Sequence, residues 1–211
     1  MADGGYDLVR ARFERPIALE AGLAAAQQHV VAAGRPVQAI AGIELRIPEP
    51  LTRDEFDAFN RGYVSSLRRL GLELDGLLPA ARTNVAPAAG GVSAPSVYAV
   101  SYTIPVDRPR PAFVLSGVPE TEISDAAAML DSIMAVLSAR LLELGASWDD
   151  ATAIQFYGVD IPARQMIDRV LSRTGSAGMN GIQWFSAHPP IEGLRFEIDA
   201  RSAGRELVLT N

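Results

Sequence analysis

The sequence contains no cysteine in its 211 residues. This absence excludes disulfide bonds, thiolate metal sites and a cysteine nucleophile. Histidine is almost as scarce, because only His29 and His188 occur. Two histidines cannot form a histidine cluster, and no spacing of Asp or Glu suggests the acidic ligand set that a zinc site would then need. We therefore expect no metal site.

Long apolar runs and basic runs are also missing. The N-terminal segment MADGGYDLVRARFERP lacks the apolar core of a signal peptide, and no apolar run approaches the ~18 residues of a membrane-spanning helix. Acidic and basic residues are interspersed along a chain of formal net charge −6, so no basic stripe is available for a phosphate backbone. We expect a soluble, cytoplasmic protein that binds neither nucleic acid nor a membrane.

Apolar residues make up 48% of the sequence, which is enough for a packed core. Their spacing predicts two long helices, at 17–33 and 125–144, each followed by a glycine that would end the helix. The apolar stripe of the first helix consists of Leu19, Leu23, Ala26, Val30 and Ala33. The stripe of the second consists of Leu130, Met134, Leu137, Leu141 and Leu144. Each residue of the second stripe lies 111 positions after its counterpart, which indicates an internal repeat.

The repeat extends beyond these two helices. In each copy one strand precedes the long helix and another follows it, and a second helix comes next, at 53–70 and 163–173. Each copy then closes on a strand, at 97–105 and 194–202. This β-α-β-α-β unit predicts an α+β fold of two tandem modules, each a sheet with two helices packed on one face.

A stretch rich in small residues, APAAGGVSAPS at 86–96, predicts a flexible loop between the copies. We place the boundary in this loop, which gives one module at 1–92 and a second module at 93–211.

Four short motifs follow one another in a fixed order. They are FDAFNRGY at 56–63, PAARTNV at 79–85, FVLSG at 113–117 and FEIDA at 196–200. The first two are similar to the patterns F-x-x-(V/F)-N-x-x-Y and P-A-R-(S/T)-x-V of the RidA superfamily (reactive intermediate deaminase, also called YjgF). The last two resemble its strand ending in Ser-Gly and its closing strand V-E-I-E-A. The sequence as a whole resembles a two-module tandem variant of that superfamily.

The resemblance implies a chorismate-mutase-like α+β fold, and oligomers with ligand clefts between neighbouring modules. It also implies hydrolysis of a reactive enamine or imine to a keto acid and ammonia, without a metal or organic cofactor. In that scheme an arginine clamps the substrate carboxylate, and a glutamate on the last strand positions water. The implied catalytic residues are Arg82 and Glu197. The implied substrate-binding residues are Asn60, Asn84, Ser116 and Gly117, with Asn84 at a position where the superfamily often has Cys.

Each module keeps a complementary half of the pattern. The first module has Arg82 and Asn60, but its opening strand lacks Ser-Gly and its closing strand lacks a glutamate. The second has the Ser-Gly pair and Glu197, but no arginine occurs between Arg173 and Arg195. One composite cleft lined by both modules would reunite the two halves. Whether Glu197 reaches the cleft that holds Arg82 is open, because clefts of the superfamily take both residues from one module.

Every candidate residue also has an ordinary structural explanation. Arg82 offers a planar fork that matches a carboxylate, but it could equally be solvated or paired within the protein. Asn60 could be an exposed polar residue of a helix, and Ser116-Gly117 could be a strand-ending turn. Glu197 could lie on a solvent-facing strand, whereas burial beside a cleft would raise its pKa and suit it to general acid–base catalysis.

Three functions follow from these patterns. The first is a RidA-like hydrolase or deaminase that acts on a small carboxylate-bearing enamine or imine. The second is a non-catalytic sensor or scaffold that binds small molecules on the same fold. The third is a specialised enzyme for an aminomuconate-like or chorismate-like substrate, since fold alone does not choose among such reactions. In each case we expect a homo-oligomer, either a dimer or a trimer.

Overall fold

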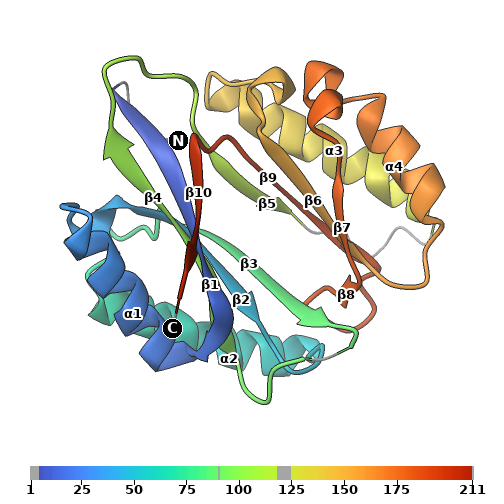
Figure 1. The fold of residues 1–211 in the computed structure, drawn as a ribbon. Helices are drawn as coiled ribbons and strands as arrows, with labels where there is room; N and C mark the ends of the chain where they lie inside the picture. Colours follow the sequence, from blue (N-terminus) through green and yellow to red (C-terminus); the bar gives the residue numbers. More distant parts are fainter. Residues whose placement is uncertain (1–4, 90, 118–124, 211) are drawn as a thin grey trace.

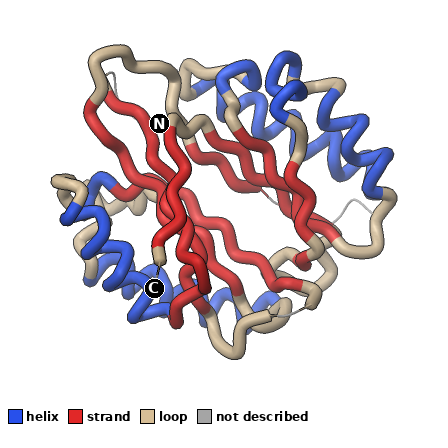
Figure 2. Tube along the Cα trace, in the orientation of Figure 1, coloured by secondary structure: helices blue, strands red, loops and turns tan. Residues whose placement is uncertain are grey.

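The computed structural model describes residues 5–89, 91–117 and 125–210. Two β-sheets face each other in the middle of the molecule, and two helices cover the outer face of each sheet (Figure 1). A trace coloured by secondary structure shows the same layers (Figure 2). The architecture is therefore a mixed α+β fold with two sheets. In the parts of the chain that the structure describes, no helix is both long enough and apolar enough to cross a membrane.

The first module is defined here as residues 6–105. Its elements are β1 (Tyr6–Ala18), α1 (Leu19–Ala32), η1 (Val37–Ala39), β2 (Ile40–Arg46), α2 (Arg53–Arg69), β3 (Ala81–Pro87) and β4 (Ser96–Pro105). Its four strands lie in the order β1-β4-β2-β3, in which β4 runs antiparallel to both of its neighbours and β3 runs parallel to β2.

The second module is defined as residues 114–201. Its elements are β5 (Val114–Gly117), α3 (Ala126–Glu143), η2 (Trp148–Asp150), β6 (Ala153–Gly158), α4 (Ala163–Leu171), η3 (Gly175–Asn180), β7 (Gln183–Phe185), β8 (Ala187–His188) and β9 (Phe196–Arg201). Its sheet has the order β5-β9-β6-β7, with β9 antiparallel to β5 and β6 and with β7 parallel to β6. The two sheets therefore repeat one topology, in agreement with the repeat in the sequence.

The predicted boundary at residues 92 and 93 falls before β4, which pairs with β1 and β2 of the first sheet. The chain leaves the first sheet after Pro105 and enters the second at Val114. The predicted boundary differs from the observed connection at 106–113 because the stretch of small residues connects β3 to β4 within the first module. Its first two residues, Ala86 and Pro87, belong to β3 rather than to a loop.

Two strands that follow α4 in the chain complete the edges of the first sheet. β8 pairs with the end of β3 in antiparallel fashion, and β10 (Arg205–Leu209) pairs with β1 in parallel. The sheet of the first module is therefore six-stranded, in the order β10-β1-β4-β2-β3-β8. The two modules are joined through strands of one sheet as well as by the connection between them.

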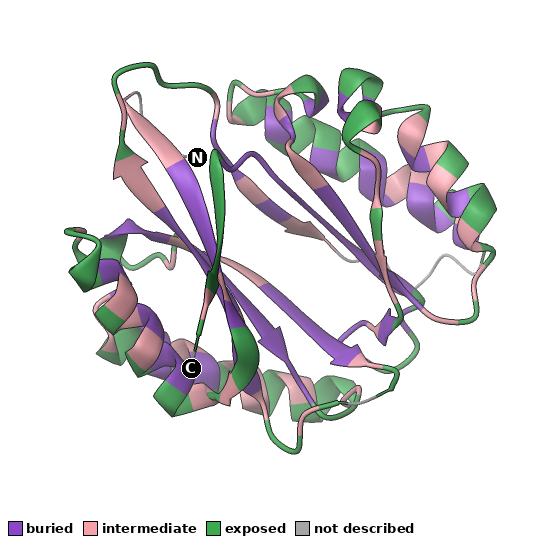
Figure 3. Cartoon of the chain, in the orientation of Figure 1, coloured by how far each residue is buried: buried purple, intermediate pink, exposed green. Residues whose placement is uncertain are grey.

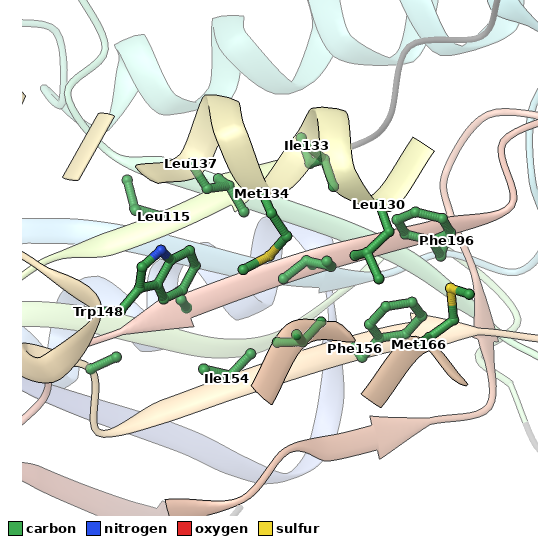
Figure 4. Packing of buried hydrophobic residues seen from close by; sticks show 14 of the residues in the cluster. Leu115, Leu130, Ile133, Met134, Leu137, Trp148, Ile154, Phe156, Met166 and Phe196 are labelled. Carbon is green, nitrogen blue, oxygen red and sulfur yellow. The ribbon is translucent and has the colours of Figure 1, made fainter. Parts of the chain in front are cut away.

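A separate apolar core packs between each sheet and its helices (Figure 3). Of the stripe predicted for α1, Leu23, Ala26 and Val30 are buried, whereas Ala33 is exposed because α1 ends before it. The stripe of α3 packs on the aromatic rings and Ile154 of the second sheet (Figure 4). The buried side chains of that stripe are Leu130, Met134, Leu137 and Leu141. The helices thus lie on one face of each sheet, as the β-α-β-α-β unit predicts.

The layer between the two sheets holds a buried polar cluster beside two small apolar clusters, one around Leu8 and one around Tyr157. Strand alternation sends Val9 and Ala11 of β1 toward the helices, so that Arg10 points between the sheets. There Arg10 Nη2 donates a hydrogen bond of 2.8 Å to Glu44 Oε2. Other buried charged and polar residues on the facing strands include Arg46, Gln155, Glu197, Asp199 and Arg201. Across the layer, Arg201 Nη2 of β9 donates a hydrogen bond of 2.7 Å to Glu206 Oε1 of β10, so paired charges also join the two sheets.

Candidate active site

A cleft of about 460 Å³ opens where β3 of the first sheet lies beside β5 of the second. Helix α2 supplies residues to one wall of the cleft, and helix α3 supplies residues to the other. The residues that line the cleft are Arg53, Phe56, Arg82, Asn84, Ser116, Gly117, Ser132, Ile133, Val136, Arg140, Pro190, Ile191 and Glu197. Both modules therefore contribute to one concave site, the kind of place where small molecules bind.

The first module contributes Arg82 and Asn84, which are two residues apart on β3 and therefore point to the same face. Arg82 Nη1 donates a hydrogen bond of 2.9 Å to Asn60 Oδ1 of α2. Asn84 is buried, and its Oδ1 atom has no hydrogen-bond partner among the described residues. A buried acceptor of this kind costs free energy unless a donor reaches it, so Asn84 is equipped to bind an N–H or O–H group in the cleft.

The second module contributes Ser116 and Gly117 at the end of β5, together with Glu197 of β9. Ser116 Oγ donates a hydrogen bond of 3.0 Å to Glu197 Oε1. The Glu197 side chain is buried, and Oε2 has no hydrogen-bond partner among the described residues. Burial raises the pKa of Glu197 well above its ordinary value, against the lowering effect of the Ser116 hydrogen bond. The environment therefore favours the protonated acid, which can donate a proton.

Three guanidinium groups line the same cleft, from Arg53, Arg82 and Arg140. Among the residues that the structure describes, none of the three has a carboxylate within ion-pair distance. Arg140 of α3 donates from Nη1 to the backbone carbonyl of Ser116 at 3.2 Å. The cleft is therefore cationic, although the chain as a whole carries a formal net charge of −6.

A second hollow of about 350 Å³ adjoins the first. Both hollows are lined by Phe56, Arg82, Asn84, Ser116 and Arg140. The second hollow is also lined by Asn60, Ala80, Ala81, Val114 and Leu115. The two are parts of one elongated site that lies between the modules.

The structure brings the candidate residues from the sequence together. Arg82, Asn84, Ser116, Gly117 and Glu197 line one cleft, and Asn60 lies in the adjoining hollow with its hydrogen bond to Arg82. Glu197 therefore reaches the cleft that holds Arg82. The catalytic and binding roles of these residues stay predictions.

Gly117 also has a packing role. A Cβ atom at this position would lie 2.8 Å from Ile133 Cδ1 and 3.1 Å from Leu137 Cδ2 of α3. Glycine therefore allows β5 to lie close to α3, which is the ordinary explanation considered for this residue.

The sequence patterns do not single out Arg140, Arg53, Ile133 or Val136, whereas Phe56 begins the first motif. Arg140 is the one basic residue of α3, and this isolation is the signal that could have identified it. In the described parts of the chain, no group of three His, Asp or Glu side chains is placed to hold a metal ion.

Comparison with curated proteins gives one strong relative. The chain is 35% identical over 228 aligned residues to 2-amino-5-chloromuconate deaminase from Comamonas testosteroni, with 99% of this chain and 90% of the relative covered. A family model described as 2-aminomuconate deaminase CnbZ matches residues 1–207.

Solved structures with the same fold include a chorismatase, at 14% identity and a TM-score of 0.57, which covers 96% of this chain and 78% of the other. A comparison with a cyanuric acid hydrolase from A. caulinodans covers 95% of this chain and 68% of the other, at 14% identity and a TM-score of 0.45. At these identities the similarity concerns the fold alone. The chorismate-mutase-like description of each module stays a prediction.

The assignment to the RidA superfamily is wrong. It rests on motifs of five to eight residues, whereas the match to the CnbZ family extends over residues 1–207, and the relative with 35% identity is an aminomuconate-type deaminase. The enzymatic interpretation is confirmed, and the non-catalytic alternative is not supported. The chain is a deaminase that belongs to the 2-aminomuconate deaminase CnbZ family.

Proposed function

We propose that this enzyme removes the amino group of a 2-aminomuconate-type compound by hydrolysis, in the cleft between the two modules. The observation that carries the proposal is that Arg82 and Glu197, from different modules, line this one cleft. The family and the 35% identical relative support the reaction class and the kind of substrate. This function corresponds to the aminomuconate alternative that the sequence leaves open.

Such a substrate is a six-carbon conjugated dicarboxylate with an amino group next to one carboxylate, and is thus an enamine. Protonation of a carbon of the conjugated chain converts the enamine into an iminium ion. Water adds to the iminium carbon and loses a proton, which gives a carbinolamine. The C–N bond then breaks as a proton moves from the hydroxyl oxygen to nitrogen, so that one water is consumed and a 2-oxo acid and ammonia are formed.

Glu197 is the proposed acid for the first step and the base for the second. Its raised pKa favours the protonated acid, and after it protonates carbon the carboxylate accepts a proton from the attacking water. Ser116 orients the carboxyl group through the hydrogen bond to Oε1. The substrate amino group donates a hydrogen bond to Asn84 Oδ1, a buried acceptor of the cleft without a partner among the described residues, which leaves the proton on Glu197 Oε2 free to reach carbon.

Arg82 binds a carboxylate of the substrate through its planar fork of N–H donors. Asn60 accepts one hydrogen bond from Arg82 Nη1, which restricts the guanidinium before substrate arrives. Restricting both the substrate and the proton donor lowers the barrier, because the reacting groups no longer have to find one another.

The composition supports direct hydrolysis. All 19 of the Lys and Arg residues are arginine, and the sequence contains no lysine. Its side chains therefore offer no amine that could form a Schiff base with the substrate.

We expect Arg82→Ala to lower kcat/KM for 2-aminomuconate by about 100-fold or more, because an unclamped substrate is poorly oriented toward Glu197. Ammonia release by a coupled assay measures the effect. Arg61→Ala is the matched control, because Arg61 is exposed on the same helix as Asn60 and does not line the cleft. Activity in Arg82→Ala equal to that of the control would contradict the proposal.

A further inference from the structure

We propose that Arg140 binds a second carboxylate, so that the cleft selects dicarboxylates whose two ends are held by Arg82 of the first module and Arg140 of the second. This inference deepens the proposed function, on which it rests. It assigns a role to a residue of α3 that the motifs do not include, and it predicts that the site binds monocarboxylates weakly.

The first reason is the position of Arg140. Arg82 and Arg140 line both parts of the elongated site, whereas Arg53 lines only the larger part. They belong to different walls, since Arg82 is on β3 of the first sheet and Arg140 is on α3 above the second. A rigid conjugated molecule with a carboxylate at each end can therefore meet one guanidinium on each wall.

The second reason is the charge of the site. Among the described lining residues the only carboxyl group is that of Glu197, which burial holds toward its neutral form, while three guanidinium groups lack a carboxylate partner. Elsewhere in the described structure, arginines such as Arg169 and Arg173 pair with a nearby carboxylate. An excess of positive charge confined to one cleft is complementary to a doubly negative ligand.

The third reason is the way Arg140 is held. One of its five N–H donors bonds to the Ser116 carbonyl, which steadies the guanidinium and leaves donors for a carboxylate. The hydroxyl group of the same serine bonds to Glu197. Ser116 therefore links the second carboxylate site to the proton donor, so binding at Arg140 fixes the substrate relative to Glu197.

The test uses two ligands that cannot react because they lack an amino group. Muconate is a six-carbon chain with two conjugated double bonds and a carboxylate at each end. Sorbate is the same chain with a carboxylate at one end only. We expect the unmodified enzyme to bind muconate about 10- to 100-fold more tightly than sorbate in isothermal titration calorimetry, the factor that one charge-assisted pair supplies. Arg140→Ala should weaken muconate binding by about that factor and leave sorbate binding within about twofold.

Arg140 is exposed, so its truncation should not disturb folding, and Arg61→Ala again serves as the matched control. Arg140→Lys keeps a charge without the planar fork, so its affinity for muconate should lie between those of the unmodified enzyme and of Arg140→Ala. The double variant Arg82→Ala, Arg140→Ala should bind neither ligand.

Three results would overturn the inference: no preference of the unmodified enzyme for muconate, unchanged muconate affinity in Arg140→Ala, or the same loss on Arg53→Ala instead. These outcomes are separate from failure of the proposed function. If the enzyme prefers muconate through Arg140 but releases no ammonia from 2-aminomuconate, the dicarboxylate site stands and the reaction does not.

Discussion

Two carboxyl groups of the polar layer between the sheets have pKa values that move in opposite directions. Burial raises the pKa of Glu44, but the ion pair with Arg10 outweighs burial and lowers it to about 2. Burial and the negative charge of Glu44 raise the pKa of Asp199 to about 7, against the lowering effects of Arg201 and Tyr157. Both carboxyl groups lie near an arginine, so the difference follows from the close two-point pairing of Glu44 with Arg10 and from the negative charge that Glu44 places near Asp199.

Asp199 gives the fold a dependence on pH. In the unfolded chain its proton is lost near the ordinary value of 3.8, whereas in the folded protein the proton stays until about pH 7. Between these values the folded state holds more protons, so raising the pH destabilises it. Glu44 does not contribute to this change above about pH 5, because its pKa is low in the folded state and ordinary in the unfolded state.

We expect the free energy of unfolding to fall between pH 5 and pH 8, and Asp199→Asn to remove on the order of 1–3 kcal/mol of that fall. Glu197 titrates in the same direction and accounts for part of the remainder. Urea unfolding at the two pH values measures the change. Asp57→Asn, on the exposed face of α2, is the control. Equal pH dependence in Asp199→Asn and in the control would show that Asp199 does not hold its proton.

At the scale of single elements, α1 depends on one glycine to approach its sheet. A Cβ atom on Gly22 would lie 2.7 Å from Val97 Cβ of β4 and 2.8 Å from the backbone oxygen of Ile17. Distances this short require either the helix or the strand to move. In α2, by contrast, a Cβ atom on Gly62 would meet nothing within 4 Å.

The two glycines therefore predict opposite results for one substitution. Gly22→Ala should destabilise the protein by about 1–3 kcal/mol through overpacking. Gly62→Ala should stabilise it by about 0.5–1 kcal/mol, because alanine restricts the unfolded chain and favours the helix. Denaturant unfolding of both variants gives the comparison. A destabilisation of equal size in both variants would contradict this view of how α1 packs on β4.

The helices could be predicted from the sequence because their signal is local. The apolar stripes gave α1 and α3 to within a few residues, and Thr52 and Glu55 form the capping box that begins α2. The strand β10 could not be predicted in this way. Four of its five residues are exposed, so the strand has no alternation of buried and exposed side chains that would mark it. Its partner, β1, lies at the other end of the chain.

At the scale of the whole molecule, the site depends on how the two sheets meet. The motifs identified Arg82, Asn84 and Glu197 one by one, but their meeting depends on contacts between modules that have no local signature. Short motifs also suggested the wrong superfamily, because patterns of a few strand and turn residues recur on unrelated proteins. The predicted homo-oligomer stays a prediction.

The two modules meet functionally where Arg82 and Glu197, as we propose, act on one substrate in one cleft. A double-mutant cycle on kcat/KM for 2-aminomuconate tests whether the two residues act together, with Arg82→Ala, Glu197→Gln and the double variant. Arg61→Ala and Glu143→Gln are the controls, because both residues are exposed and lie outside the cleft. Each single variant should have a kcat/KM about 100-fold or more below that of the unmodified enzyme. The kcat/KM of the double variant should be at most about 10-fold below that of the less active single variant, because the effects of residues that act as a unit are not additive. A double loss equal to the product of the single losses, or a single variant with the activity of its control, would contradict the claim.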